Sequence, residues 1–164
     1  MIKILPVILF LIIILLLFSC FGVDKVANKS QCIGKENKDV ELRWGYRIKS
    51  KNEYFGYTLI SNGDVYKQNK FRMSKKLSHI KPIYYCSLYK KVMAEFLLTQ
   101  TLNVPADTTV YIEYVHPSKG VRLKAYWNPK FKAVGSKVFR EIWNELDETL
   151  PDENSELYEM RMTF

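Results

Sequence analysis

The sequence predicts an α+β domain, in which one antiparallel sheet in β-β-β-α-β-β-α order carries two amphipathic helices packed on one face. Three observations lead to this fold class. Several segments alternate apolar and polar residues, as half-buried strands do. Short turns join these segments, and the Asn62-Gly63 pair is the strongest hairpin signal among them. Two longer segments repeat apolar residues every three or four positions, as helices that bury one face do.

The first strands are expected between residues 41 and 67. Residues 41–51 alternate an apolar face with a basic face. The apolar positions are Leu42, Trp44, Tyr46 and Ile48, and the basic ones are Arg43, Arg47 and Lys49. Residues 54–60 are rich in aromatic and β-branched side chains, which favour a second strand. A third strand begins at Val65, and residues 71–77 allow a fourth.

A first helix is expected over residues 82–102, because Pro82 suits a first turn and Asn103 and Pro105 end the pattern. Its apolar stripe comprises Tyr85, Tyr89, Val92, Met93, Phe96, Leu97 and Gln100, with Lys90, Lys91, Glu95 and Thr99 on the other side. The stripe is continuous along the segment, so this helix is expected to pack against the sheet.

Two further strands are expected over residues 108–116 and 121–127, joined by a turn that contains Gly120. A second helix follows over residues 136–150, and Pro151 ends it. Its apolar stripe consists of Phe139, Ile142, Trp143, Leu146 and Leu150. All three tryptophans obey the periodicity of their elements, which predicts that Trp44, Trp127 and Trp143 belong to the core.

The amino-terminal residues carry an export pattern. A short charged segment ends at Lys3, an unbroken apolar run follows over residues 4–18, and Leu17-Phe18-Ser19-Cys20 comes next. This pattern resembles the signal peptide and lipobox of bacterial lipoproteins. The resemblance implies cleavage after residue 19, a diacylglycerol on the sulfur of Cys20, and a membrane anchor for the whole protein. It implies a cell-envelope location on the non-cytoplasmic side of a bacterial membrane, the outer one where there are two.

Two other interpretations of the amino-terminal residues remain open. The run over residues 4–23 is long enough to span the ~30 Å hydrocarbon core as an uncleaved signal anchor. Cleavage with free secretion is the other, although the usual small-x-small cleavage pattern is missing. All three interpretations place the domain outside the cytoplasm.

The chain after the signal peptide divides into three parts. Residues 20–38 are polar, lack periodicity and are expected to form a flexible tether. Residues 39–151 make the single α+β domain, and residues 152–164 are an acidic tail or an added edge strand. With Cys20 lipidated, Cys32 and Cys86 remain, and in an oxidising compartment they either form a disulfide or stay as two thiols.

The charge is unevenly distributed. Residues 20–140 contain 23 Lys and Arg against 9 Asp and Glu, whereas residues 141–164 contain 8 acidic residues against Arg161 alone. One basic segment, which has aromatic residues beside it, is the candidate binding patch; it comprises Lys67, Lys70, Arg72, Lys75, Lys76 and Lys81. Such a patch suits an anionic glycan, a lipid headgroup or an acidic protein. The export pattern argues against nucleic acid, and the alternative is a solvated basic loop.

No motif for catalysis is present. The sequence has two histidines and lacks the His-Glu-x-x-His, Cys-x-x-Cys, Gly-x-Ser-x-Gly and phosphate-loop patterns, so no metal or cofactor site is predicted. His79 and His116 are expected to be solvated. The sequence therefore predicts a non-catalytic binding or interaction module of the cell envelope. Its rivals are an envelope inhibitor or immunity protein, and an enzyme assembled from separated residues such as Glu113, His116 and Tyr126.

Overall fold

A computed structural model describes residues 32, 34–69, 72–99, 102–104, 106–130, 132 and 134–151, apart from the side chains of residues 35, 72 and 74. The predicted signal peptide, Cys20, most of the tether, Lys70 and the acidic tail lie outside the described residues. The chain divides into two compact units, residues 1–31 and 32–164. All described residues belong to the second unit.

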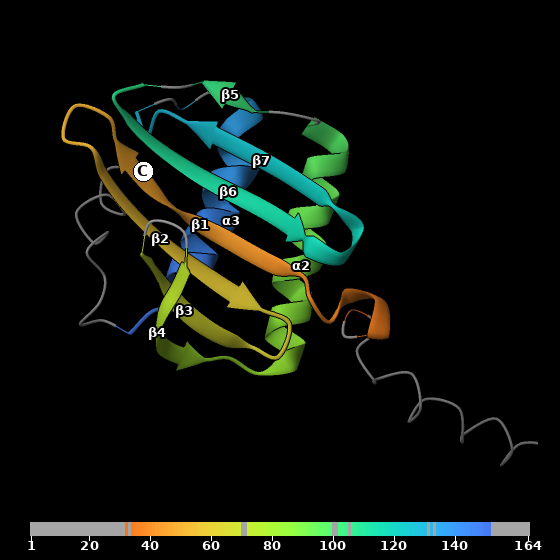
Figure 1. Cartoon of the computed structure of the whole chain (residues 1–164). Helices are drawn as coiled ribbons and strands as arrows, with labels where there is room; N and C mark the ends of the chain where they lie inside the picture. The colour runs from red at the N-terminus through yellow and green to blue at the C-terminus, as the bar shows by residue number, and fades with distance from the viewer. Residues whose placement is uncertain are drawn as a thin grey trace, which may run out of the picture. The chain divides into compact units, whose positions relative to one another are not determined.

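The described domain is a mixed α+β structure with a seven-stranded sheet in the order β4-β3-β2-β1-β6-β7-β5 (Figure 1). Its neighbours are antiparallel, except that the short β5 runs parallel to β7. The strands are β1 (Glu41–Ile48), β2 (Glu53–Ile60), β3 (Asp64–Asn69), β4 (Arg72–His79), β5 (Asn103–Val104), β6 (Thr108–His116) and β7 (Val121–Trp127). The helices are α2 (Pro82–Thr99) and α3 (Lys137–Asp147), with single 3-10 turns at Lys35–Asn37, Pro117–Lys119 and Val134–Ser136.

The observed element order corrects the predicted one. Four strands precede α2 and three lie between α2 and α3, whereas three and two were predicted. The additional strands are β4, which pairs with β3 through two register shifts, and β5, which has only two residues. Register shifts and short length both erase the alternation on which sequence analysis depends.

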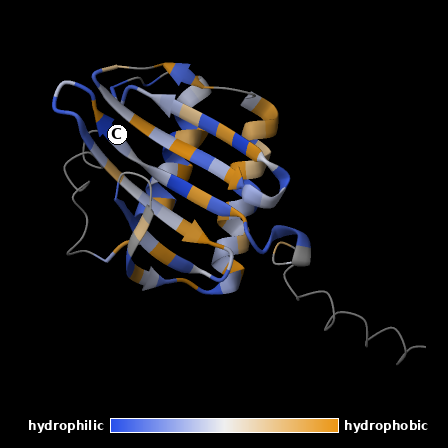
Figure 2. Ribbon diagram, in the orientation of Figure 1, coloured by the Kyte–Doolittle hydropathy of each residue, from blue (hydrophilic) through white to orange (hydrophobic). Residues whose placement is uncertain are grey.

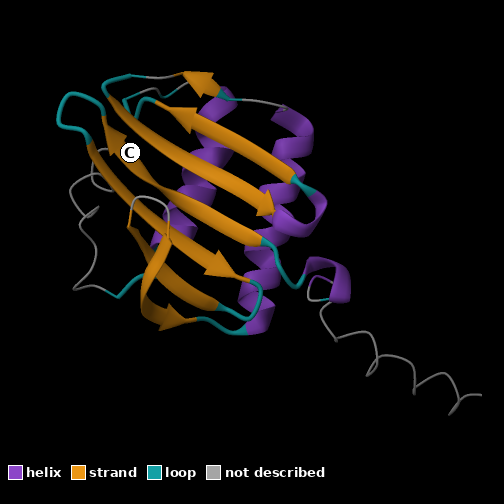
Figure 3. Ribbon diagram, in the orientation of Figure 1, coloured by secondary structure: helices purple, strands orange, loops and turns teal. Residues whose placement is uncertain are grey.

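Both helices lie behind the sheet in the view of Figure 1, so they cover one face of the sheet, and no helix of the described residues covers the other. Figure 3 shows the same two layers by secondary structure. We call the side of the sheet opposite the two helices the open face; it carries the outward positions of β1, such as Arg43 and Arg47. Figure 2 shows the resulting bands of hydrophobic and hydrophilic residues along the strands.

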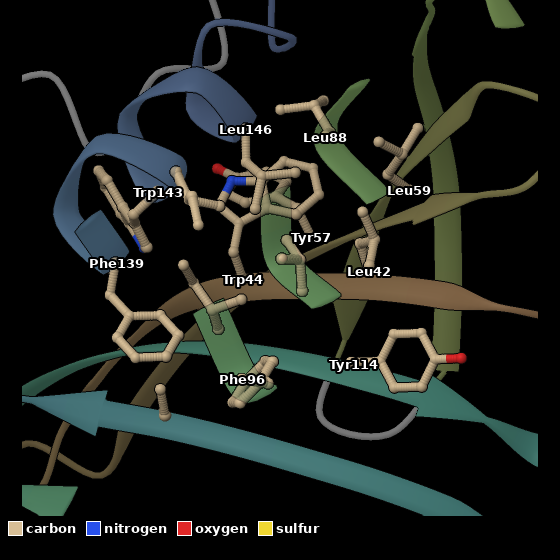
Figure 4. Packing of buried hydrophobic residues seen from close by; sticks show 14 of the residues in the cluster. Leu42, Trp44, Tyr57, Leu59, Leu88, Phe96, Tyr114, Phe139, Trp143 and Leu146 are labelled. Atoms are coloured by element: carbon tan, nitrogen blue, oxygen red, sulfur yellow. The ribbon is translucent and has the colours of Figure 1, made fainter. Parts of the chain in front are cut away.

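The core fills the space between the sheet and the helices. Trp44, Trp127 and Trp143 are fully buried, which confirms their predicted place. Figure 4 shows side chains of α2 and α3 meeting those of the sheet. Phe96 of α2 packs edge-on against Phe139 of α3, with ring centroids 5.2 Å apart. Phe139 also packs against Trp127 of β7, with ring centroids 6.1 Å apart, so aromatic contacts join the helices and the sheet in one core.

The buried face of α2 differs from the predicted stripe. Glu95 is buried, whereas Leu97 is 75% exposed. The helix is rotated so that the residues facing the core are Tyr85, Cys86, Leu88, Val92, Glu95 and Phe96. Burial of the Glu95 carboxylate is compensated by a hydrogen bond from the Thr99 hydroxyl one turn later.

The folded unit begins earlier than Asp39, where the sequence analysis placed its start. Cys32 is buried in the core, and a disulfide joins it to Cys86 of α2 with the two Cα atoms 5.6 Å apart. The end of the predicted tether is therefore fixed to the helix layer. Among the residues that the structure describes, no helix is long and apolar enough to cross a membrane.

Candidate binding groove on the open face

A groove of about 1010 Å³ runs over the open face of the sheet. Alternation along the strands places its side chains, because every second residue of β1, β6 and β7 points away from the helices. The lining residues are Arg43, Arg47, Lys49, Asn52, Glu53, Tyr54, Gln68, Ala106, Asp107, Thr109, Tyr111, Glu113, Arg122, Lys124 and Tyr126. Five of them are cationic and three are acidic, so the groove is basic.

Two facing glycines, Gly45 and Gly56, lie beneath the tyrosine side chains at the centre of the groove. One row across the sheet contains Tyr111 of β6, Gly45 of β1, Gly56 of β2 and Gln68 of β3, each paired with the next. A Cβ atom at Gly56 would lie 2.5 Å from the Tyr111 hydroxyl oxygen and 2.8 Å from Gln68 Oε1. The missing side chain therefore leaves the space in which the Tyr111 side chain lies across the sheet.

Two tyrosines form a hydrogen-bonded wall above these glycines. The hydroxyl oxygens of Tyr54 and Tyr111 are 2.5 Å apart, and the rings stack with centroids 5.7 Å apart. Tyr54 also donates a hydrogen bond to Gln68 Oε1 at 3.0 Å. Burial raises the pKa of both hydroxyls, that of Tyr111 well above 10. Both tyrosines are therefore neutral hydrogen-bonding groups at physiological pH.

A buried carboxylate positions two of the cations. Arg122 Nη2 lies 3.0 and 2.8 Å from the two carboxylate oxygens of Glu113, and Lys124 Nζ lies 2.7 Å from one of them. The Glu113 side chain is only 3% exposed, whereas Arg122 is 59% and Lys124 is 41% exposed. One negative charge thus holds two positive ones, and the cations remain open to solvent with a net charge of +1.

Aromatic rings support the lysine of this cluster. The Lys124 ammonium lies 4.8 Å from the ring centroid of Tyr111 and 5.8 Å from that of Tyr126. Both distances are within the range of a cation–π interaction. Tyr111 and Tyr126 are directly opposite each other on β6 and β7, so the lysine is held between two neighbouring rings.

The other end of the groove is built from the β1–β2 hairpin and the segment before β6. Asp107 accepts hydrogen bonds from the Ser50 backbone N–H at 2.8 Å and from its hydroxyl at 2.7 Å, which lower the pKa of the carboxyl. Arg47 and Lys49 are exposed here. Within the described part of the chain, neither of these two cations forms a salt bridge.

The predicted basic segment is not gathered into one surface. Lys67 of β3 lies directly opposite Lys75 of β4, whereas Lys76 lies opposite Tyr66, the next position along β3. Successive strand residues point to opposite faces, so these lysines are divided between the two sides of the sheet. Lys76 is bound to Asp64 at 2.6 Å. Of the remaining members, Lys81 is exposed before α2, Lys70 lies outside the described residues, and the side chain of Arg72 is not described.

The structure corrects the expectation that the His116 side chain is solvated. His116 is 2% exposed, not solvated, because its position on β6 faces the helices. Its Nδ1 atom lies 3.2 Å from the Ser118 hydroxyl and 3.4 Å from the Asp39 carboxylate. In a catalytic serine triad the histidine binds the serine through one ring nitrogen and the carboxylate through the other. Here Ser118 and Asp39 both lie near the same nitrogen of His116, Nδ1. Glu113 lies on the open face, so the sheet separates it from His116.

The sequence analysis identified the outward basic face of β1 and the range of β7, but not the groove. Arg43 and Arg47 are on β1, and Arg122 and Lys124 are on β7, far apart in the sequence. They share a surface because β6 pairs with both strands. The signals in the sequence are the basic outward face of β1 and the alternation of Arg122, Lys124 and Tyr126 along β7.

The chain matches no known protein-family model, and no curated protein is significantly similar to it. The geometry of the groove therefore carries the functional argument.

Proposed function

We propose that the protein is a lipid-anchored binding module of the bacterial cell envelope, and that the groove on its open face binds an anionic ligand. The observation that carries the proposal is the charge arrangement of the lining. Arg47 and Lys49 have no salt bridge among the described residues. Glu113 neutralises only one of the two positive charges of Arg122 and Lys124. An anion can therefore contact cations at both ends of the groove.

The physical cost of binding is small at these cations. Arg47, Lys49, Arg122 and Lys124 are exposed before any ligand arrives. Glu113 already holds two of them, Arg122 and Lys124, in place. These two preorganised cations lose less side-chain entropy on binding than free side chains do. The attraction is electrostatic, so it weakens as salt shortens the screening length to ~8 Å at physiological ionic strength.

Binding is tested with the soluble domain, residues 21–164, by calorimetry against a carboxylated oligosaccharide, polyphosphate and anionic phospholipid vesicles. The double variant Arg47→Gln/Lys49→Gln is compared with Lys90→Gln/Lys137→Gln, which removes the same charge from the helix layer. We expect binding that falls with NaCl, and at least a tenfold loss in the first variant only. Equal loss in both variants would show that net charge, not the groove, attracts the ligand.

The envelope location rests on the resemblance of residues 1–20 to lipoproteins and is tested separately. The full chain is expressed in a bacterium with labelled palmitate. We expect the parent protein to be labelled and the Cys20→Ala variant to be unlabelled and to retain its signal peptide. Equal labelling and equal mass of the two proteins would refute lipidation.

A further inference from the structure

The groove offers hydrogen-bond acceptors beside its cations. Glu53 and Asp107 contribute carboxylates, and Asn52 and Gln68 contribute amides, to the same lining as Arg47 and Lys49. A ligand that carries only negative charge would be repelled by the carboxylates. A ligand that also carries hydroxyl groups can donate hydrogen bonds to them. The lining therefore fits a ligand with both anionic groups and hydroxyl donors.

Two tyrosine rings add a third kind of contact. Tyr54 is 36% exposed and Tyr126 is half-buried, and both line the groove. The face of an aromatic ring has a negative electrostatic potential and attracts polarised hydrogen atoms, such as those of the C–H groups of a sugar ring. The lining contains one aliphatic residue, Ala106, and therefore offers no site for an acyl chain. This composition favours a sugar over a phospholipid.

The size of the groove indicates an oligomer. Arg43 and Lys49 are six residues apart and both line it, which corresponds to about 20 Å along a strand at ~3.3 Å per residue. A volume of about 1010 Å³ lies at the upper end of the range for small-molecule sites. Cations stand at both ends of this length, so the ligand carries more than one anionic group.

We infer that the groove takes an acidic oligosaccharide, a hydroxyl-rich sugar chain with carboxylates on its rings. This inference rests on the proposed function and names its ligand class. Carboxylates of the ligand contact Arg47 and Lys49 at one end and the Arg122–Lys124 pair at the other. Sugar rings lie against Tyr54 and Tyr126, and their hydroxyls reach the acceptors of the lining. Bacterial polysaccharides and animal cell surfaces both present this chemistry.

The test compares four probes on residues 21–164. Mannuronate oligomers represent bacterial polysaccharides and hyaluronate oligomers represent animal surfaces; the methyl-esterified mannuronate oligomer has no charge, and polyphosphate has no hydroxyl-rich rings. We expect a uronate to bind at least tenfold more tightly than either control. The uronate that binds more tightly identifies the source.

Variants at Tyr126 test the ring contact. Tyr126→Phe keeps the ring, and Tyr126→Leu keeps much of the apolar bulk without it. We expect uronate binding to be unchanged in the first variant and to weaken about tenfold in the second, with both variants retaining the circular dichroism spectrum of the parent. Polyphosphate binding that equals uronate binding and is indifferent to Tyr126→Leu would overturn the oligosaccharide and leave the anionic-ligand proposal standing. If none of the charged probes binds in a salt-dependent way, both the oligosaccharide inference and the anionic-ligand proposal are overturned.

Discussion

The Tyr54–Tyr111 wall of the groove depends on the absence of a side chain at Gly56, so replacing this glycine with alanine is the sharpest perturbation of the site. The new Cβ atom would lie 2.5 Å from the Tyr111 hydroxyl oxygen, 2.8 Å from Gln68 Oε1 and 3.0 Å from the Tyr54 ring. Tyr111 is only 2% exposed, so it has little space into which it can move. We expect the Tyr54–Tyr111 hydrogen bond to break.

The magnitude of the destabilisation follows from three contributions. Overpacking of a well-packed site costs roughly 1–3 kcal/mol. Loss of one hydrogen bond adds about 1 kcal/mol. The lower entropy of the unfolded chain with alanine offsets about 0.4–1 kcal/mol. The net loss in free energy of unfolding is therefore about 2 kcal/mol.

Urea unfolding of residues 21–164 measures this loss. A change of about 2 kcal/mol lowers the midpoint by about 1 M at the slope usual for a domain of this size. Gly135→Ala is the matched control, because no atom lies within 4 Å of its added Cβ and its backbone does not have positive φ. Near-ultraviolet circular dichroism reports on the tyrosine wall in both variants.

Equal urea midpoints for Gly56→Ala and Gly135→Ala would refute the reasoning. So would a destabilised Gly56→Ala with an unchanged tyrosine spectrum, because the loss would then arise elsewhere than at the Tyr54–Tyr111 wall.

Three further predictions concern charge and covalent structure. Glu113→Gln leaves two cations without their counter-charge, and because these are partly exposed we expect a loss of about 1–2 kcal/mol in urea unfolding. Reduction of the Cys32–Cys86 disulfide releases a constraint over a sequence separation of 54, which corresponds to about 4 kcal/mol in the chain-entropy account, measured as unfolding with and without dithiothreitol. Hydrogen bonds from Lys76 and His79 lower the pKa of Asp64 from 3.8 to about 2. The carboxylate therefore stabilises the fold above pH 4 and loses this effect as the pH falls through 2. Unfolding at several pH values should show Asp64→Asn destabilised at pH 7, with the difference from the parent disappearing as the pH falls below about 2.

The local structure of the domain could be predicted from the sequence where one period dominates. Alternation located β1 and β7, and the 3.6-residue stripe located α3 with Phe139 and Trp143 in the core. These elements bury one face against a single neighbouring layer, so burial and periodicity agree. In α2 they do not agree, since Glu95 is buried through a local hydrogen bond that hydropathy does not reveal.

The groove could not be predicted because it arises from strand order. The β1–β6 pairing joins Arg43 to Glu113 across a separation that includes a helix and four strands. No local pattern encodes such a pairing. The role of Gly56 is likewise invisible in the sequence, because it depends on the side chain of Tyr111, two strands away. The candidate binding patch stands out in the sequence by its density of positive charge. Alternation along β4 nevertheless places Lys75 and Lys76 on opposite faces of the sheet.

The disulfide at Cys32 also limits the length of the segment that connects Cys20 to the folded domain. In the proposed envelope location the lipid sits on Cys20, and the 12 residues from there to Cys32 extend to at most about 43 Å at ~3.6 Å per residue. If the disulfide were reduced, the first residue anchored in the domain would shift from Cys32 towards the buried Val40. The segment that connects Cys20 to the domain would then lengthen by up to about 29 Å. In the proposed location, the redox state of this disulfide would therefore set how far from the membrane the groove can reach.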